Sequence, residues 1–229
     1  MEASFWDGKR APGVKDAIDL SQYDSVVEVI ENSFKRYADR PAFTSIGYTL
    51  TYRQIDEYSA AFANYLQNHT TLKPGDSIAI QMPNILQYPI AMYGALRAGL
   101  RVVNTNPLYT EREMLHQFND SGAKALLCMD VFAKSVQGVK DQTGIKHIIV
   151  TSLADMLPGF KRVLINAAAK HIKKMVPAYS LPEAVSFRKC LKLGQGKGFQ
   201  PTHMKNPHDT IILQYTGGTT GVAKGAELT

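Results

Sequence analysis

The chain has 229 residues, of which 45% are hydrophobic and 20% charged, with a formal net charge of +6. This composition suits a globular chain with a sizeable core, and no apolar run approaches the roughly 18 residues of a membrane span. The N-terminal residues lack the basic and apolar regions of a signal peptide, and Cys128 and Cys190 are too far apart in sequence to suggest a disulfide framework. We therefore expect a cytoplasmic protein.

Hydrophobic periodicity predicts helices and strands that alternate along the chain. The expected helices span residues 24–38, 51–66, 86–98, 110–121 and 131–142, with capping boxes opening the second at Thr51 and the fourth at Thr110. The expected strands span residues 42–46, 49–51, 77–81, 100–103, 125–128, 146–150 and 210–214, and the first two form a hairpin that turns at Gly47 and Tyr48. Alternation of this kind implies right-handed βαβ units, so the predicted fold class is α/β with helices layered on largely parallel sheets.

Between Pro158 and Pro177 the sequence predicts a basic amphipathic helix. Apolar residues, among them Val163, Leu164 and Ile172, recur at helical spacing. The other positions hold five cations and no acidic residue: Lys161, Arg162, Lys170, Lys173 and Lys174. Two interpretations stay open. The apolar face packs on its own domain, which we favour, or it lies in an anionic membrane interface. No nucleic-acid partner is expected, because aromatic residues do not interleave with the cations.

The most informative stretch is the loop at 215–225, which follows an apolar run expected to be a buried strand. Residues 216–221 hold three glycines and three threonines, and Lys224 follows. Glycines let backbone N–H groups approach an anion, threonine hydroxyls donate to phosphate oxygens or bind Mg²⁺, and a lysine adds positive charge. The loop therefore indicates polyphosphate binding. A Walker A loop has Gly directly before its Lys, whereas Ala223 stands here, which argues against a P-loop NTPase.

The stretch 213–224 resembles the AMP-binding signature of the adenylate-forming superfamily, which includes acyl-CoA synthetases, luciferases and peptide-synthetase adenylation domains. Further stretches resemble superfamily landmarks in the expected order, at 49–52, 72–76, 82–84, 94–99 and 103–110. Gly217, Ala223 and the segment 171–179 resemble the bacterial long-chain fatty acyl-CoA synthetases in particular. Glu227 departs from the pattern, because relatives usually carry an apolar residue there, and this leaves open how the strand after the loop packs.

The resemblance implies the large N-terminal domain of an adenylate-forming enzyme. Residues 1–22 would be an N-terminal extension, and residues 23–229 a partial AMP-binding domain with its phosphate loop at 215–225. Superfamily members continue for more than the same length again, with the Mg²⁺-binding glutamate and the adenylation lysine in that later part. We therefore expect a truncated domain that is inactive alone and contains no catalytic residue of its own.

The resemblance also implies the ligands and the reaction. The implied nucleotide-binding residues are Tyr215, Thr216, Gly217, Gly218, Thr219, Thr220, Gly221, Lys224 and Gly225, and the Thr216 hydroxyl is the implied Mg²⁺ ligand. The full-length protein would be an ATP-dependent acid–thiol ligase that converts a long-chain fatty acid into an acyl-adenylate and passes the acyl group to coenzyme A. The alternatives are a medium-chain acyl-CoA synthetase and a non-catalytic nucleotide- or membrane-binding module. In the membrane interpretation, residues 158–177 would hold the protein on the inner face of the cell membrane. The sequence indicates no oligomeric state.

Overall fold

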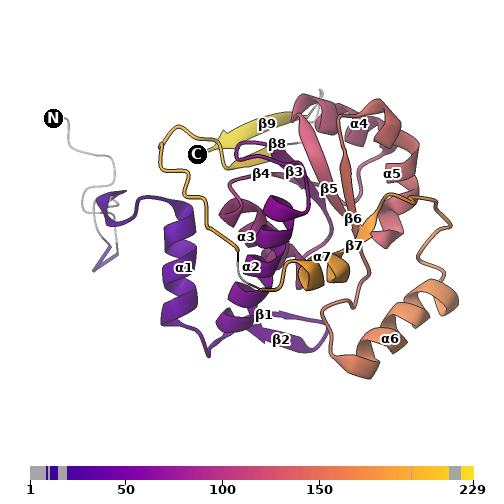
Figure 1. The fold of residues 1–229 in the computed structure, drawn as a ribbon, viewed down its shortest axis with the longest axis horizontal. Coiled ribbons are helices and arrows are strands. Elements are labelled where there is room, and N and C mark those ends of the chain that lie inside the picture. Colours follow the sequence, from indigo (N-terminus) through magenta and orange to yellow (C-terminus); the bar gives the residue numbers. More distant parts are fainter. Residues whose placement is uncertain (1–8, 10, 15–19, 197, 217–222) are drawn as a thin grey trace.

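The computed structural model describes residues 9, 11–14, 20–196, 198–216 and 223–229. Over these residues the centre of the molecule is a seven-stranded sheet in the order β7-β6-β5-β3-β4-β8-β9 (Figure 1). Its strands are β3 (Ser77–Gln81), β4 (Arg101–Thr105), β5 (Ala123–Met129), β6 (His147–Thr151), β7 (Val185–Ser186), β8 (Ile212–Thr216) and β9 (Lys224–Leu228). All neighbouring strands run parallel except β8 and β9, so the predicted, largely parallel sheet is confirmed.

Helices cover both faces of the sheet, and each face buries its own core. The α-helices are α1 (Val26–Arg36), α2 (Tyr52–Asn68), α3 (Gln87–Arg97), α4 (Glu111–Asp120), α5 (Ala133–Val139), α6 (Gly159–Ala167) and α7 (Phe187–Leu193). Helices α1, α2, α3 and α7 pack on the face that presents Ile78 and Ile80. Helices α4 and α5 pack on the opposite face, against Ala79 and Val103. Among the described helices, none has the length and apolar character needed to cross a membrane.

Short polar signals fix where several helices begin and end. The predicted capping boxes are both present, with Thr51 opening α2 and Thr110 opening α4. Gly99 and Gly122 follow α3 and α4 with φ angles of 77° and 60°, a backbone conformation that glycine adopts without a Cβ clash. These local features allow each helix to end sharply, so the next strand enters the sheet within a few residues.

The hairpin of β1 (Pro41–Ser45) and β2 (Tyr48–Thr51) turns one residue earlier than predicted. Its two central residues are Ile46 and Gly47, with φ angles of 51° and 66°. Two positive φ angles are the mark of a tight type I′ turn, whose twist matches that of the flanking strands. The sequence obscured this turn because a β-branched residue rarely adopts a positive φ.

The basic segment after β6 is helical over fewer residues than predicted, and its apolar face is exposed. Helix α6 continues into a π-helical turn over Ala168–Ile172. Val163 is 58% exposed, Leu164 54% and Ile172 76%, whereas Ala169 is the one buried residue of these two elements. The favoured interpretation, in which this face packs on its own domain, is therefore wrong for the described chain. The physical reason is visible in Figure 1, where α6 stands away from the sheet at the lower right.

Candidate phosphate-binding site

The predicted phosphate loop connects the two antiparallel strands β8 and β9. Thr216 and Lys224 are opposite partners in this ladder, so the two ends of the loop are held one strand spacing apart. Side chains of opposite residues point to the same face, which places the Thr216 hydroxyl and the Lys224 ammonium together on one side of the hairpin. Both residues are exposed. Gly217, Gly218, Thr219, Thr220 and Gly221 lie outside the described residues, and their predicted contacts stay predictions.

Tyr215 anchors the start of the loop. Its hydroxyl donates a hydrogen bond to Oδ2 of Asp120 on α4, at 2.5 Å. Burial of the ring and the neighbouring Asp120 carboxylate both raise the pKa of Tyr215, which therefore stays a protonated donor at neutral pH. A Cβ at Gly225 would lie 3.0 Å from two atoms of the Tyr215 ring, so glycine permits the close approach of the two strands.

The other end of the loop is held by the same helix. His116 Nε2 lies 2.9 Å from the backbone oxygen of Ala223, and because that oxygen only accepts, the histidine is the donor. His116 and Asp120 are four residues apart, so they occupy the same face of α4 one turn from each other. One helix face thus fixes both Tyr215 and Ala223, and the loop has anchored ends on either side.

A polar network joins β8 to its neighbours on the opposite face of the sheet. Gln214 Oε1 accepts a hydrogen bond of 2.9 Å from Asn104 Nδ2 on β4. Asn104 Oδ1 in turn accepts one of 2.9 Å from the Tyr88 hydroxyl on α3. The backbone oxygen of Asn104 accepts a further hydrogen bond, of 3.0 Å, from Gln117 Nε2 of α4. These bonds fix the strand ends from which the loop emerges.

A pocket of about 380 Å³ lies at these strand ends. It is lined by Ile80, Met82, Asn84, Tyr88, Asn104, Thr105, Asn106, Tyr109, Gln214 and Tyr215. Ligands of open α/β sheets bind outside the carboxyl ends of the parallel strands, and this pocket occupies that position for β3, β4 and β8. Because Gln214 and Tyr215 line it, the pocket adjoins the start of the phosphate loop.

Three buried polar side chains near the carboxyl ends of β3 and β4 have an atom without a partner among the described residues, and one of them, Thr105, lines the pocket. Gln81 and Thr105 are paired residues at the ends of β3 and β4. Gln81 Oε1, Thr105 Oγ1 and Gln117 Oε1 are buried and make no hydrogen bond with the described residues. Unsatisfied polar groups of this kind are uncommon in native cores.

Five residues around the site were not predicted from the sequence: Tyr88, Asn104, Gln214, His116 and Asp120. One signal was available for two of them. Strands β3, β4 and β8 carry Gln81, Asn104 and Gln214 near their carboxyl ends, each directly after an aliphatic residue. An amide side chain at that end of a buried strand indicates the edge of the sheet at which a ligand binds. The roles of His116 and Asp120 depend on packing between α4 and the hairpin, which the sequence does not show.

The predicted Mg²⁺ ligand, the Thr216 hydroxyl, stays a prediction. Within them, no group of three or more His, Cys, Asp or Glu side chains could hold a metal on its own. Mg²⁺ usually takes few protein oxygens and completes its shell with substrate phosphates and water. A single hydroxyl such as that of Thr216, next to a phosphate-binding loop, is compatible with this arrangement.

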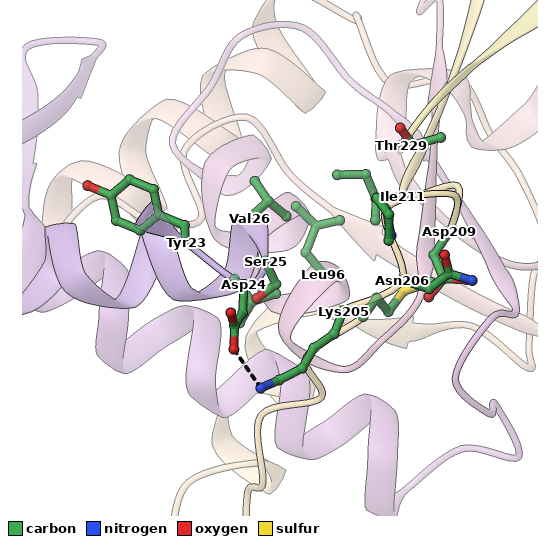
Figure 2. Close-up of a pocket in the computed structure, with 13 residues that line it drawn as sticks. Tyr23, Asp24, Ser25, Val26, Leu96, Lys205, Asn206, Asp209, Ile211 and Thr229 are labelled. Carbon is green, nitrogen blue, oxygen red and sulfur yellow. Dashed lines mark hydrogen bonds and ion pairs between the residues drawn. The ribbon is translucent and has the colours of Figure 1, made fainter. Parts of the chain in front are cut away.

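A second pocket, of about 420 Å³, lies between the start of α1 and the segment 204–211 (Figure 2). Across its opening Lys205 Nζ lies 2.8 Å from Asp24 Oδ2. The lysine charge is therefore already compensated. This pocket lies away from the phosphate loop and its cation is paired, so it offers no free charge to a phosphate. The nucleotide site predicted at 215–225 stays a prediction.

Residues 30–229 match the sequence model of the family described as AMP-binding enzyme. The chain belongs to the AMP-binding enzyme family. It is 48% identical to a long-chain-fatty-acid–CoA ligase of Escherichia coli O157:H7 over 98% of this chain, and 49% identical to one of Yersinia pestis over 96%. In each case the match spans about 40% of the relative, in its N-terminal part.

Solved structures of CoA ligases share the fold. A crystal structure of the anthranilate CoA ligase AuaEII with anthranoyl-AMP superposes with a TM-score of 0.73 at 17% identity, over 92% of this chain and 36% of that one. A long-chain-fatty-acid-CoA ligase from Archaeoglobus fulgidus superposes with a TM-score of 0.67 at 21% identity, over 90% and 36%. The three-layer arrangement is thus that of the N-terminal domain of adenylate-forming enzymes.

Proposed function

We propose that the protein carrying this chain is an ATP-dependent ligase that joins long-chain fatty acids to coenzyme A. The observation that carries the proposal is the 46–49% identity, over nearly the whole chain, to bacterial proteins that all bear this name. The expected chemistry has two steps. The fatty acid carboxylate attacks the α-phosphate of ATP to give acyl-adenylate and pyrophosphate, and the coenzyme A thiol then displaces AMP.

In this proposal the β8–β9 hairpin binds the polyphosphate. Lys224 supplies a positive charge to the phosphate oxygens and Thr216 a hydroxyl, while residues 217–221 contribute backbone N–H groups. Mg²⁺, when bound, offsets the negative charge of the phosphates. The hairpin contributes by positioning and by charge stabilisation, not by a covalent bond. Anchoring of the loop ends at Tyr215 and Ala223 supports this role, because it fixes the positions of Thr216 and Lys224 before the nucleotide binds.

The pocket at the ends of β3, β4 and β8 is the proposed place for the reacting end of the fatty acid. It adjoins the loop that would hold the leaving pyrophosphate. The Tyr88 hydroxyl and the Asn104 amide line it, and burial raises the pKa of Tyr88, so the phenol remains a neutral donor. We assign these two residues to orientation of the substrate, and no proton transfer to either.

Acyl-CoA formation by the full-length protein tests the proposal. With ATP, Mg²⁺ and coenzyme A, oleate should react at least about tenfold faster than anthranilate or benzoate, and also faster than octanoate. A preference for octanoate would favour the medium-chain alternative. A preference for an aromatic acid would contradict the proposal, although the fold would be the same. Residues 1–229 alone, which span about 40% of the relatives, should form no acyl-CoA.

We further propose that the protein is cytoplasmic and associates with anionic membranes through α6. The supporting observation is the exposed apolar face of α6, with Phe160 76% exposed, beside the cations of residues 161–174. A basic amphipathic helix with an apolar face free to enter lipid binds anionic interfaces. Replacing Lys170, Lys173 and Lys174 with Gln should weaken co-sedimentation with anionic vesicles and leave the unfolding temperature nearly unchanged. Equal co-sedimentation of variant and wild type would contradict the membrane role.

A further inference from the structure

A third pocket, of about 630 Å³, opens at the root of α6 and concentrates positive charge. Three of its lining residues come from three different helices: Arg162 lies on α6, Arg188 on α7 and Tyr58 on α2. The other polar residues of the lining are Lys189 and Lys192 of α7, Tyr48 of β2 and Gln195, and none of the lining residues is acidic. We call this the basic pocket.

The charge of the basic pocket is uncompensated. None of its four cations forms an ion pair with a described residue, in contrast to Lys124, Lys140 and Lys205 elsewhere on the surface. Arg188 uses one donor, since Nη1 bonds to the backbone oxygen of Asp155 at 2.8 Å. This bond holds the guanidinium in place, and its other N–H groups have no hydrogen-bond partner among the residues that the structure describes. Four like charges around one concave site indicate an anionic ligand.

Phosphate is the anion whose chemistry fits this lining best. Guanidinium groups bind phosphate oxygens bidentately, lysine ammonium groups add point charges, and the two tyrosine hydroxyls can donate hydrogen bonds. The volume is large enough for a phosphate ester with a small substituent.

The position of the basic pocket indicates which kind of molecule carries the phosphate. Pro158 and Arg162 line the pocket, and the exposed apolar residues Phe160, Val163 and Leu164 are their close neighbours in sequence. Figure 1 shows α6 starting beside the β1–β2 hairpin. Tyr48 of that hairpin lines the basic pocket together with Pro158 and Arg162. When this apolar face enters the acyl boundary of a bilayer, the pocket comes to lie at the level of the headgroups. Tyrosine is enriched at that level of membranes.

We infer that the basic pocket binds the phosphate headgroup of an anionic phospholipid while α6 lies in the membrane interface. The inference rests on the proposed membrane association of α6 and adds a specific site to it. The helix supplies apolar insertion and diffuse charge, and the basic pocket supplies recognition of one headgroup. The protein would therefore prefer lipids with an accessible anionic phosphate over zwitterionic ones.

Co-sedimentation with vesicles of phosphatidylcholine and phosphatidylglycerol (3:1) tests the inference in the full-length protein. The pocket variant combines Arg188→Gln, Lys189→Gln and Lys192→Gln. Its matched control combines Lys35→Gln, Lys73→Gln and Lys146→Gln, three exposed lysines without an ion pair to a described residue. Each cation near an anionic surface contributes roughly fivefold to binding, so the pocket variant should bind on the order of a hundredfold more weakly. The control variant should lose less than about threefold.

Further experiments distinguish whether the basic pocket or α6 lacks its proposed role in membrane binding. Loss of binding in Val163→Ser/Leu164→Ser/Ile172→Ser, together with equal binding by the pocket and control variants, would retain α6 as the membrane helix and overturn the pocket. Absence of vesicle binding by the wild type would overturn both. Calorimetric titration with glycerol 3-phosphate separates the two sources of phosphate. If the wild type binds this soluble ester but not vesicles, and the pocket variant does not bind the ester, the assignment to a lipid headgroup would be overturned.

Discussion

Tyr215 and Gly225 determine how closely β8 and β9 approach at the base of the phosphate loop. The Tyr215 ring lies against the Gly225 backbone, and its hydroxyl is bound to Asp120. The loop position therefore depends on a contact that no residue with a Cβ at 225 can make without displacing the ring.

Gly225→Val should accordingly disturb the loop. The added carbon would lie 3.0 Å from the Tyr215 ring, and overpacking of this kind costs about 1–3 kcal/mol. We expect a lower unfolding temperature and weaker ATP binding by calorimetry. Gly144→Val is the control, because a Cβ there meets only one atom within 4 Å, at 3.7 Å. Unchanged ATP binding in a folded Gly225→Val protein would show that the strand spacing does not set the loop geometry.

Asp76 makes the free energy of unfolding depend on pH in acidic solution. Although burial opposes the effect, hydrogen bonds from Lys124 Nζ at 2.6 Å and from the Lys73 backbone lower the pKa of the Asp76 carboxyl. A lowered folded-state pKa stabilises the fold above the unfolded-state pKa, and this contribution is lost as the pH falls below about 4 through the folded-state value.

Asp76→Asn should therefore reduce the free energy of unfolding by about 1 kcal/mol at pH 7, with a smaller difference at pH 3. Urea unfolding at the two pH values measures this. Asp39→Asn, at a carboxyl that is 85% exposed, should change stability little at either pH. A difference for Asp76→Asn that grows on acidification would show that the carboxylate does not stabilise the fold.

At the scale of elements, Arg97 ties three helices together. Its guanidinium, on α3, pairs with Glu31 of α1 at 3.2 Å and with Asp56 of α2 at 2.8 Å, and its side chain is only 7% exposed. It also lies over the rings of Phe34 and Phe199, at 5.6 and 4.8 Å from their centroids. The first layer of helices is thus joined by one buried cation.

Arg97→Met should lower the free energy of unfolding by about 3–5 kcal/mol, because it leaves two carboxylates without their partner. Arg53→Met is the matched control, since Arg53 pairs with Asp39 at 2.8 Å on an exposed surface, where the expected loss is below about 1 kcal/mol. Denaturant unfolding compares them. Equal losses in the two variants would contradict the role assigned to Arg97.

Helix α6 differs from the other helices because its apolar side chains contribute little to folding. Replacement of Val163, Leu164 and Ile172 with Ser should change the free energy of unfolding by no more than about 0.5 kcal/mol per site. Leu127→Ala, at a fully buried residue of β5, should cost about 2–5 kcal/mol in the same assay. A loss of several kcal/mol from the α6 variant would mean that this face is buried after all.

For the whole molecule, local patterns predicted the fold well, and long-range packing explains where they did not. Capping boxes at Thr51 and Thr110 were predictable because each involves residues three apart. The exposure of α6 was not predictable, since it depends on what the rest of the chain places opposite the helix. The same holds for the site. The loop was visible as a motif, whereas its anchors His116 and Asp120 come from contacts that span about a hundred residues.

The central claim is that the hairpin loop next to Lys224 holds the phosphates of ATP during activation of a fatty acid. Exchange of labelled pyrophosphate into ATP by the full-length protein, dependent on oleate, measures that step most directly. Lys224→Ala should slow exchange at least about tenfold, roughly 1.4 kcal/mol of transition-state stabilisation, whereas Lys146→Ala, at an exposed lysine away from the loop, should leave it unchanged. Wild-type exchange in folded Lys224→Ala protein, or exchange that proceeds without a fatty acid, would contradict the claim.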